Sequence, residues 1–338
     1  MASQSRVRIG YLIERAAKLK PSNLTQFARQ AKKVTKKPMI WLIFDMLWCS
    51  ARYELGFRDY AVWDFAILKR RERKTWMTHP KSHRYSLSVN SREHWEWVDD
   101  KFKFTEKFGD LLGRDWIDVR AADSDTFAEF VRKHPRIIVK PIDGLGGDSI
   151  EVLGAEETAD PTALQRRLLE SGQVLVEALI EQHPKMASLH PRSVNTVRMI
   201  TFLAPDDQLH VLAAVLRIGN GASVDNFASG GMYTLLDETG RAPYAGVDKY
   251  SNVYETHPIT GTRIVGFQVP DFDRVLALVE DAARRIPQVP YIGWDIAITP
   301  DGPALIEGNN DSSVFQTKPS VSGVKTGLLP VYQRAIGF

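Results

Sequence analysis

The stretch GWDIAITPDGPALIEGNN, residues 293–310, decides the fold of this chain. It contains two short apolar runs, WDIAIT and PALIEG, separated by the turn-forming sequence Pro-Asp-Gly, and this pattern predicts a β-hairpin. Asp295 stands near the start of the first strand, whereas Glu307 and Asn309 stand at the end of the second. Because side chains alternate along a strand, Glu307 and Asn309 share a face. The hairpin therefore predicts three oxygen-bearing side chains at one end of the strand pair.

Two carboxylates and an amide carbonyl are ligands that suit Mg²⁺ bound together with phosphates. In the alternative interpretation, these acids simply face solvent. The neighbouring residues favour a buried setting, in which unpaired acids are costly. These neighbours include Ile296, Ile298, Leu305 and Ile306. We therefore expect a metal site made by Asp295, Glu307 and Asn309.

A second informative stretch is RIIVKPIDGLGGDSIEVL, residues 136–153. Lys140 ends a β-rich run and offers a point charge for a phosphate group. The glycine-rich loop that follows permits a turn whose backbone N–H groups approach phosphate oxygens closely. Its glycine spacing fits neither a Walker loop nor a dinucleotide fingerprint, and a strand rather than a helix follows it. The loop residues expected at a nucleotide are Asp143, Gly144, Gly146 and Gly147.

Taken in order, Lys-Pro with a glycine loop, VLVEALIEQH and DIAI…LIEGN resemble the ATP-grasp superfamily. The phrases SVNTVR, GWDIAIT and IEGN are most similar to its sugar-transfer-associated branch. This resemblance covers roughly residues 95–335. It implies an α+β fold in which two lobes sandwich ATP.

The resemblance also implies residues that bind the nucleotide. Lys101 and Lys140 match the lysines that hold the α- and β-phosphates, with Lys103 as a competitor for the first role. Glu177 matches the acid at the adenine hinge, and the backbone of Ile180 would read the base edge. The acid that binds ribose in many relatives has no clean counterpart, which leaves three candidates. These are Gln182, His183 and Asn195.

For the reacting phosphate, the resemblance implies a metal site at Asp295, Glu307 and Asn309, with Glu307 bridging two Mg²⁺ ions. Arg198 and Arg217 resemble arginines of glutamate-ligase-like relatives that neutralise the γ-phosphate and the acyl phosphate. The sequence VDNFASGG, residues 224–231, resembles their asparagine-and-glycine loop and would bring Asn226 and Gly230 near that phosphate. For each arginine the alternative is an ordinary salt bridge at a strand edge.

Charge is distributed unevenly along the 338 residues. Residues 1–90 hold 19 Lys and Arg against 6 Asp and Glu, a balance of +13, whereas the remainder hold 25 against 35, and the two parts give the net charge of +3. A basic N-terminal region indicates solvated helix faces or contact with an anionic surface, either lipid or acidic saccharide. We expect no specific nucleic-acid partner, because the aromatic residues there have helical spacing that suits core packing.

A single cysteine, Cys49, excludes an internal disulfide and fits a reducing cytoplasm. The first thirty residues lack the apolar segment of a secretory signal. The longest apolar run, PMIWLIFDMLWCSA, is too short to span a bilayer and carries Asp45. We therefore expect a cytoplasmic protein in which this run forms a buried helix.

Three regions are expected along the chain. Residues 1–95 would form a basic, mostly helical extension, residues 96–175 a central lobe with the Lys-Pro strand and glycine loop, and residues 176–338 a C-terminal lobe with the adenine hinge and metal site. DFDRVLALVEDAARRI, residues 271–286, predicts an amphipathic helix within the last region. The fold class is thus α+β, with an ATP-grasp core and a helical N-terminal extension.

The resemblance implies an ADP-forming carbon–nitrogen ligase. ATP would activate a carboxylate as an acyl phosphate, and an amine would then displace phosphate to form an amide or peptide bond. The substrates would be an amino acid, a peptide or a sugar derivative, and the sequence leaves the oligomeric state open. One alternative is a small-molecule or sugar kinase on the same fold, with Asp143, Asp148 or His183 as weak candidates for the acceptor base. The other is a non-catalytic module that binds anionic glycan or membrane through its basic N-terminal region.

Overall fold

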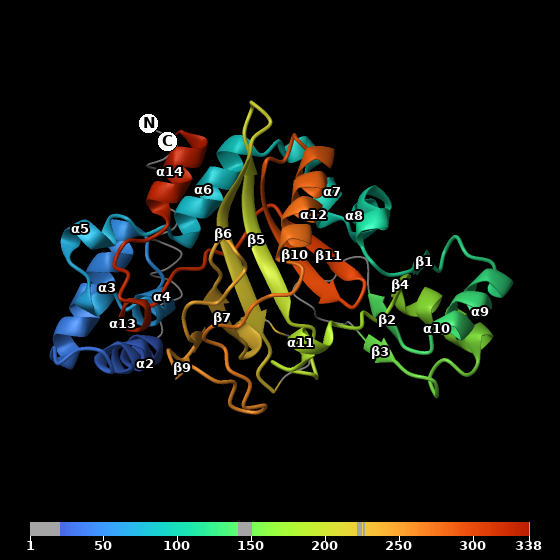
Figure 1. Ribbon diagram of the computed structural model, residues 1–338, viewed down its shortest axis with the longest axis horizontal. Helices are drawn as coiled ribbons and strands as arrows, with labels where there is room; N and C mark the ends of the chain where they lie inside the picture. The colour runs from blue at the N-terminus through green and yellow to red at the C-terminus, as the bar shows by residue number, and fades with distance from the viewer. Residues whose placement is uncertain (1–20, 141–150, 222–224, 226, 338) are drawn as a thin grey trace.

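Two antiparallel β-sheets organise the molecule (Figure 1). The computed structural model describes residues 21–140, 151–221, 225 and 227–337. Within these residues, the smaller sheet has four strands in the order β1-β4-β2-β3, and the larger has seven in the order β11-β10-β5-β6-β7-β8-β9. Helices and sheets are mixed, and a helical region precedes both sheets, which confirms the predicted α+β class.

The smaller sheet consists of β1 (Trp116–Asp118), β2 (Ile137–Lys140), β3 (Glu151–Leu153) and β4 (Leu175–Ala178). Helices α9 (Ser124–Lys133) and α10 (Pro161–Ser171) pack against it, and each begins at an aspartate whose side chain accepts a backbone N–H. Ile137, Val139 and Val176 join the core beneath these helices. Because side chains alternate along a strand, Lys140 and Glu177 project from the opposite face.

The larger sheet includes the hairpin that the sequence predicts. β10 (Tyr291–Thr299) and β11 (Gly302–Asn309) pair antiparallel, with Asp295 opposite Glu307. Gly302 has a φ of 133°, a conformation open to glycine, and it closes the turn. The other strands are β5 (Thr196–Leu203), β6 (Leu209–Ile218), β7 (Met232–Leu235), β8 (Gly246–Asp248) and β9 (Val253–Tyr254).

Separate apolar cores cover the two faces of the larger sheet. On one face lies α12 (Phe272–Arg285), the predicted amphipathic helix, which packs Val275 and Val279 against Trp294 and Ile296. The N-terminal helices cover the other face, where Ile200, Phe202, Val215 and Tyr291 share a core with Trp76 and Phe65. The N-terminal region is therefore a third layer of the molecule.

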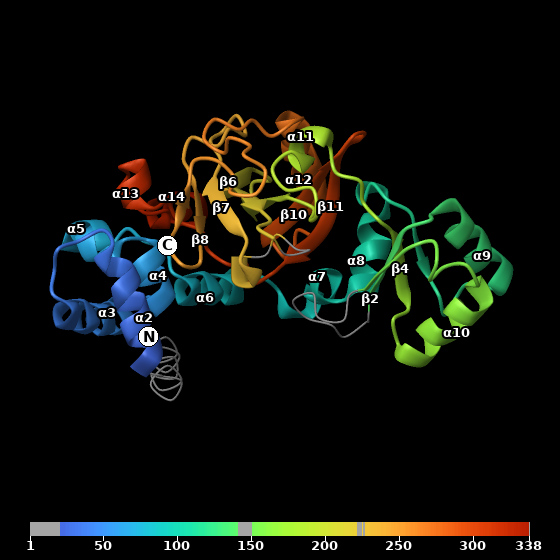
Figure 2. The ribbon, with the colours of Figure 1, turned by 90° about the horizontal axis from the view of Figure 1, so that it is seen from below.

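The helices of this third layer and its neighbours are short. They are α2 (Pro21–Lys32), α3 (Met39–Tyr53), α4 (Phe57–Val62), η1 (Phe65–Ile67), α5 (Arg70–Arg73), α6 (His79–Val89), η2 (Arg92–His94), α7 (Glu96–Asp99), α8 (Lys101–Phe108) and η3 (Gly109–Leu111). Later in the chain follow α11 (Pro184–Ala187), η4 (Phe227–Ser229), α13 (Pro319–Ser322) and α14 (Leu329–Ile336). Figure 2 shows α2, α3 and the smaller sheet at opposite ends of the molecule, with the larger sheet between them.

A buried ion pair attaches the N-terminal layer to the C-terminal segment. Lys318 Nζ lies 2.5 Å from Asp64 Oδ1 and also donates to Ser251 Oγ at 2.7 Å. Both charged side chains are almost fully buried. Removing one partner of such a pair costs about 3–5 kcal/mol, because the other charge is left without compensation.

Helices α7 and α8 contribute Val98, Phe104 and Phe108 to the core of the larger sheet, whereas Phe102 joins the core of the smaller sheet. The apolar run that forms α3 is only half buried. One face packs inside, but several large apolar side chains on the other are exposed, so the prediction of a buried helix was wrong for that face. Within the described ranges, no helix combines the length and apolar character needed to cross a membrane.

Candidate functional site

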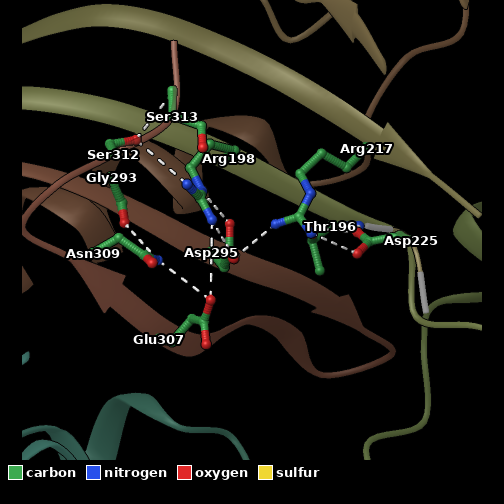
Figure 3. A network of polar contacts seen from close by, with 10 residues as sticks. All are labelled: Thr196, Arg198, Arg217, Asp225, Gly293, Asp295, Glu307, Asn309, Ser312 and Ser313. Carbon is green, nitrogen blue, oxygen red and sulfur yellow. Dashed lines mark hydrogen bonds and ion pairs between the residues drawn. The ribbon is translucent and has the colours of Figure 1, made fainter. Parts of the chain in front are cut away.

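One row of side chains crosses four strands of the larger sheet (Figure 3). Arg198 on β5 stands opposite Asp295 on β10, and Asp295 stands opposite Glu307 on β11. Directly opposed residues share a face of the sheet, so these three side chains project together. Arg217 on β6 lies two residues beyond Val215, the partner of Arg198, and joins the same face. The pairing of the hairpin with β5 and β6 in one sheet thus brings the predicted arginines and acids together.

Asp295 is held between the two arginines. Arg198 donates to both of its carboxylate oxygens, through Nε and through Nη2 at 2.7 Å, and Arg217 Nη1 donates to Oδ2 at 2.8 Å. Burial alone would raise the pKa of Asp295, but Arg198 and Arg217 outweigh it and hold the pKa well below its usual range. Asp295 therefore remains an anion while shielded from water.

A second acid fixes the other side of Arg217. Arg217 Nη2 donates to Asp225 Oδ1 at 2.9 Å, and the other oxygen of Asp225 accepts the backbone N–H of Thr196 at 3.0 Å as well as its hydroxyl. Burial raises the pKa of Asp225, whereas Arg217 lowers it. Sequence reasoning missed Asp225, although it lies within the quoted run VDNFASGG. Its neighbour Asn226 lies outside the described residues.

Glu307 occupies the more open end of the row. Its side chain is 56% exposed, and Arg198 Nη2 lies 4.0 Å from its Oε1. Asn309 donates through Nδ2 to the same oxygen at 3.3 Å. Partial desolvation and the nearby charge of Asp295 raise the pKa of Glu307. Two carboxylates therefore crowd one another at the place where the sequence predicts a metal.

The donor set at this end fits a hard divalent cation. Within the described ranges no three His, Cys, Asp or Glu side chains group as a metal cluster, since the set here is two acids and an amide. Asp295 accepts three N–H groups, whereas a carboxylate has about four lone-pair sites. Within the described part of the chain, one lone-pair site on Oδ1 thus receives no N–H donor. Together with Glu307 and the amide oxygen of Asn309, it supplies the oxygen ligands that Mg²⁺ prefers.

Gly293 lets the chain that follows β11 approach the row. A Cβ atom at Gly293 would lie 2.1 Å from Ser312 Oγ, a distance that real contacts do not reach. Ser312 in turn accepts from Arg198 Nη1 at 3.4 Å. This glycine opens the quoted motif, and its role in admitting Ser312 is not visible from the sequence.

The smaller sheet presents a second charged cluster. Lys140 Nζ and Arg114 Nε donate to the same oxygen of Glu177, at 2.6 and 2.7 Å. Burial would raise the pKa of Glu177, but Lys140 and Arg114 lower it to about 2. For Lys140, burial lowers the pKa, whereas Glu177 and, among weaker influences, Glu307 raise it.

Arg114 connects the two sheets. Besides its contact with Glu177 on β4, it donates through Nη1 to the backbone oxygen of Leu305 on β11 at 2.8 Å. Its side chain is only 4% exposed. Sequence reasoning missed Arg114, because it lies in no recognisable motif. Through these hydrogen bonds, Arg114 links the lysine cluster to the strand that carries Glu307.

The remaining predicted residues fall into three groups. Asp143, Gly144, Gly146 and Gly147 lie outside the described residues. Lys101 begins α8, and Lys103 Nζ is held by Glu96 at 2.5 Å. The backbone of Ile180, between β4 and α11, makes no hydrogen bond within the described part of the chain, as an adenine-reading edge requires. These assignments stay predictions.

All three candidates for ribose binding, Gln182, His183 and Asn195, have structural contacts. The ring nitrogen Nδ1 of His183 caps α11 by accepting the backbone N–H of Lys185 at 3.1 Å. The backbone N–H of His183 donates to the backbone oxygen of Ile298 on β10 at 2.7 Å. Asn195 is fully buried, and its amide bonds to Gln182 at 2.9 Å and to the backbone of Gly219 at 3.1 Å. Their geometry favours bracing of the link between the sheets, and their nucleoside roles stay predictions.

The fold and the paired clusters define the class of ATP-grasp proteins. The profile of the family described as sugar-transfer associated ATP-grasp matches residues 80–326, which is most of the chain. The protein belongs to this family, as the resemblance in its motifs implies. ATP-grasp enzymes in general use ATP with Mg²⁺. No curated protein sequence matches the chain.

Several solved structures are similar to parts of this chain at low identity. The ATP-grasp ligase PsnB, complexed with the precursor peptide PsnA2 and AMPPNP, is 17% identical over 79% of this chain and 68% of its own, with a TM-score of 0.43. D-alanyl-alanine synthetase A from Vibrio cholerae is 11% identical over 72% of this chain and 61% of its own, with a TM-score of 0.40. N5-carboxyaminoimidazole ribonucleotide synthetase from Thermotoga maritima is 10% identical over 69% of this chain and 48% of its own, with a TM-score of 0.37.

Proposed function

We propose that the protein is an ATP-dependent carboxylate–amine ligase, which forms an amide or peptide bond through an acyl phosphate and releases ADP and phosphate. The observation that carries this proposal is the bridge that Arg114 makes between Glu177 on β4, at 2.7 Å, and the backbone oxygen of Leu305 on β11, at 2.8 Å. The lysine cluster therefore lies beside the strand that carries Glu307 and Asn309. The cations of the two clusters and the oxygen ligands of the hairpin would together suit a triphosphate with its divalent cation.

Each group has a role that its chemistry supports. Lys140 would neutralise the charge of the nucleotide phosphates, and Glu177 with Arg114 would fix its position. Arg198 and Arg217 would hold the γ-phosphoryl group through the N–H groups that Asp295 and Asp225 do not use. Because Asp295 and Asp225 already orient the guanidinium groups, little reorganisation is needed when the charge shifts during transfer.

In the first half-reaction, a carboxylate oxygen of the substrate attacks the γ-phosphorus. A new oxygen–phosphorus bond forms, the bond to the β-phosphate oxygen breaks, and ADP leaves. In the second, the nitrogen of a neutral amine attacks the acyl carbon, the carbon–oxygen bond to phosphate breaks, and the amine loses a proton. Positioning and charge stabilisation carry most of the barrier reduction in phosphoryl transfer. The residues of the row are suited to these two tasks.

Glu307, Asn309 and the remaining site on Asp295 would hold Mg²⁺, with Glu307 bridging a second ion. When bound, the metal supplies positive charge against the β- and γ-phosphate oxygens. The raised pKa of Glu307 supports this assignment, because a cation relieves the repulsion between Glu307 and Asp295. The carboxylate substrate would be an amino acid, a peptide or a sugar acid, and the second substrate would carry the amine.

A screen of pooled carboxylates against pooled amines tests this function. ADP release is measured, and each hit is analysed by mass spectrometry. A product equal to the two substrates minus water is expected, together with ADP and phosphate. ADP released with a stable phosphorylated product would instead identify a kinase. For that alternative, Asp143 and Asp148 lie outside the described residues, and the ring nitrogen Nδ1 of His183 is already used to cap α11.

Nucleotide binding is tested separately by calorimetry with ATP and Mg²⁺. Lys140→Ala is expected to weaken binding at least about tenfold, since the variant loses a direct charge contact with phosphate. Lys133→Ala is the matched control, because Lys133 lies in the same lobe but pairs with Asp115 at the surface. Equal affinity in the two variants would remove Lys140 from the phosphate site.

A further inference from the structure

Helix α3 exposes an apolar face. Ile40, Phe44 and Trp48 recur at intervals of four residues and are 65%, 66% and 63% exposed, and Trp41 is 40% exposed. This spacing places them along one side of the helix. Single exposed apolar residues are ordinary, but a contiguous stripe of four large ones marks an interaction surface. We call these four residues the α3 stripe.

The buried side of α3 accounts for its polar residue. Asp45, the only acid or base between residues 39 and 51, receives two hydrogen bonds of 2.7 Å from Arg73 and one of 2.6 Å from Tyr60. Leu42, Met46 and Cys49 lie in the core on the same side. Between residues 39 and 51 the helix is thus apolar on most of its surface, and its one charge in that span is paired inside the protein. Its outward face is left without charge over three turns.

Cations surround the stripe. Lys37 Nζ lies 3.9 Å from the ring centre of Trp41, and Arg52 follows at the other end of α3. Residues 21–74 hold five acids, of which Asp45, Glu54 and Asp64 pair with Arg73, Arg84 and Lys318, and Asp59 and Glu72 are half-buried. The exposed cations of the same span are Arg29, Lys32, Lys33, Lys36, Arg52, Arg58, Lys69, Arg70, Arg71 and Lys74. Exposed cations thus outnumber acids in the layer that carries the stripe, and Lys37 and Arg52 flank the stripe itself.

We propose that the α3 stripe and its surrounding cations form a docking surface for an anionic phospholipid membrane. Tryptophan, phenylalanine and isoleucine enter the boundary between headgroups and acyl chains, whereas lysine and arginine contact the anionic headgroups. The composition of the stripe and its rim matches both layers of such a surface. This inference concerns a surface distant from the phosphate site, so it does not depend on the proposed ligase activity.

The position of α3 is compatible with docking during catalysis. In both Figure 1 and Figure 2, α3 lies at the end of the molecule opposite the smaller sheet. The arginine–acid row lies between them, on the larger sheet. A membrane held at α3 would therefore leave the smaller lobe and its contacts with β11 unobstructed.

Two other occupants fit the observations less well. A second copy of the chain would bring two cation-rich surfaces together, and like charges repel. An acidic saccharide would satisfy the cations but offers no apolar layer for Phe44 and Trp48. Both remain as outcomes of the experiment, where either would overturn the proposal.

The test is co-sedimentation of the full chain with large unilamellar vesicles, either of phosphatidylcholine alone or of phosphatidylcholine and phosphatidylglycerol at about 3:1. The protein is expected to bind the anionic vesicles and to bind the neutral ones at least about tenfold more weakly, because the rim cations recognise the headgroups. Binding to the anionic vesicles is expected to weaken with salt. On binding, tryptophan fluorescence is expected to shift to shorter wavelength, since Trp41 and Trp48 leave water.

The Phe44→Ser/Trp48→Ser variant is expected to lose at least about tenfold in vesicle partitioning, since two large apolar side chains no longer enter the lipid. The matched control is Val152→Ser/Leu169→Ser, which removes exposed apolar residues from the smaller lobe and should bind normally. Thermal unfolding of all variants checks that the fold is retained.

Failure of the full chain to bind anionic vesicles at low salt would overturn the proposal. So would equal binding by both double variants, which would mean that charge alone holds the protein, as with a saccharide. A dimer in solution that Phe44→Ser/Trp48→Ser converts to monomer would identify a second copy as the occupant.

Discussion

Replacing Asp295 with asparagine should damage both stability and activity, and the two effects can be separated. Asp295 accepts three charge-assisted hydrogen bonds from Arg198 and Arg217, and only 3% of the residue is exposed. Asparagine has no charge, and its Nδ2 group would face a guanidinium donor. Two buried cations would lose their shared counter-ion, and breaking such a pair costs about 3–5 kcal/mol. We therefore expect the free energy of unfolding of Asp295→Asn to fall by about 3–5 kcal/mol.

Glu307→Gln is the matched comparison. Its side chain is 56% exposed and repels Asp295, so neutralising it should change the free energy of unfolding by less than about 0.5 kcal/mol. Both variants should lose ATP-dependent turnover, because each removes a metal ligand. Urea unfolding followed by circular dichroism, together with ADP release at saturating Mg²⁺, distinguishes the two. Equal stability of Asp295→Asn and the wild type would refute the description of Asp295 as the shared counter-ion. Near-normal turnover in either variant would refute the metal assignment.

Three further changes test other contacts. Arg114→Met should lower the free energy of unfolding by about 3 kcal/mol, because Glu177 loses a buried partner, and should speed hydrogen exchange in β4 and β11, whereas Arg114→Lys should do so less. In Glu177→Gln the free energy of unfolding should depend less steeply on pH in the acid range. The folded pKa of Glu177, about 2, lies below the unfolded value near 4.3, so the wild type loses this contribution as pH falls through that interval, and urea unfolding from pH 6 to 2 measures it. Gly293→Ala should reduce turnover at least about tenfold by displacing Ser312, and Gly293→Ala/Ser312→Gly should restore part of it; no rescue would mean that the glycine serves another purpose.

The parts of the site that the sequence predicts share one property. Asp295, Glu307 and Asn309 lie on one hairpin, whose turn and alternation are local, so short-range rules suffice to place them together. The pairing of β10 with β5, which brings Arg198 opposite Asp295, joins residues far apart in the chain. The family resemblance implied a phosphate role for Arg198, but it did not predict this pairing.

The sequence did not predict the contacts of Arg114 and Asp225, which join separate elements. Arg114 follows a glycine in a stretch without a motif, and its partners come from β4 and β11. Asp225 lies after the end of β6 and accepts a hydrogen bond from Arg217 within that strand. The exposure of α3 was also missed, because an apolar run containing one acid is typical of a buried helix, and hydropathy does not show which side lacks a neighbour.

One face of the larger sheet carries both the charged row and an apolar core, and this has a practical consequence. Strands β5, β6 and β10 carry the charged row at one end, and the same face carries Ile200, Phe202 and Tyr291 beneath the N-terminal helices. A shortened chain that starts at residue 95 would keep every proposed phosphate and metal contact, yet it would strip these strands of their cover. Each large apolar side chain so uncovered forfeits about 1.5–3 kcal/mol. Such a fragment should aggregate, so residues 21–94 belong to the core of the fold rather than being an appendage to it.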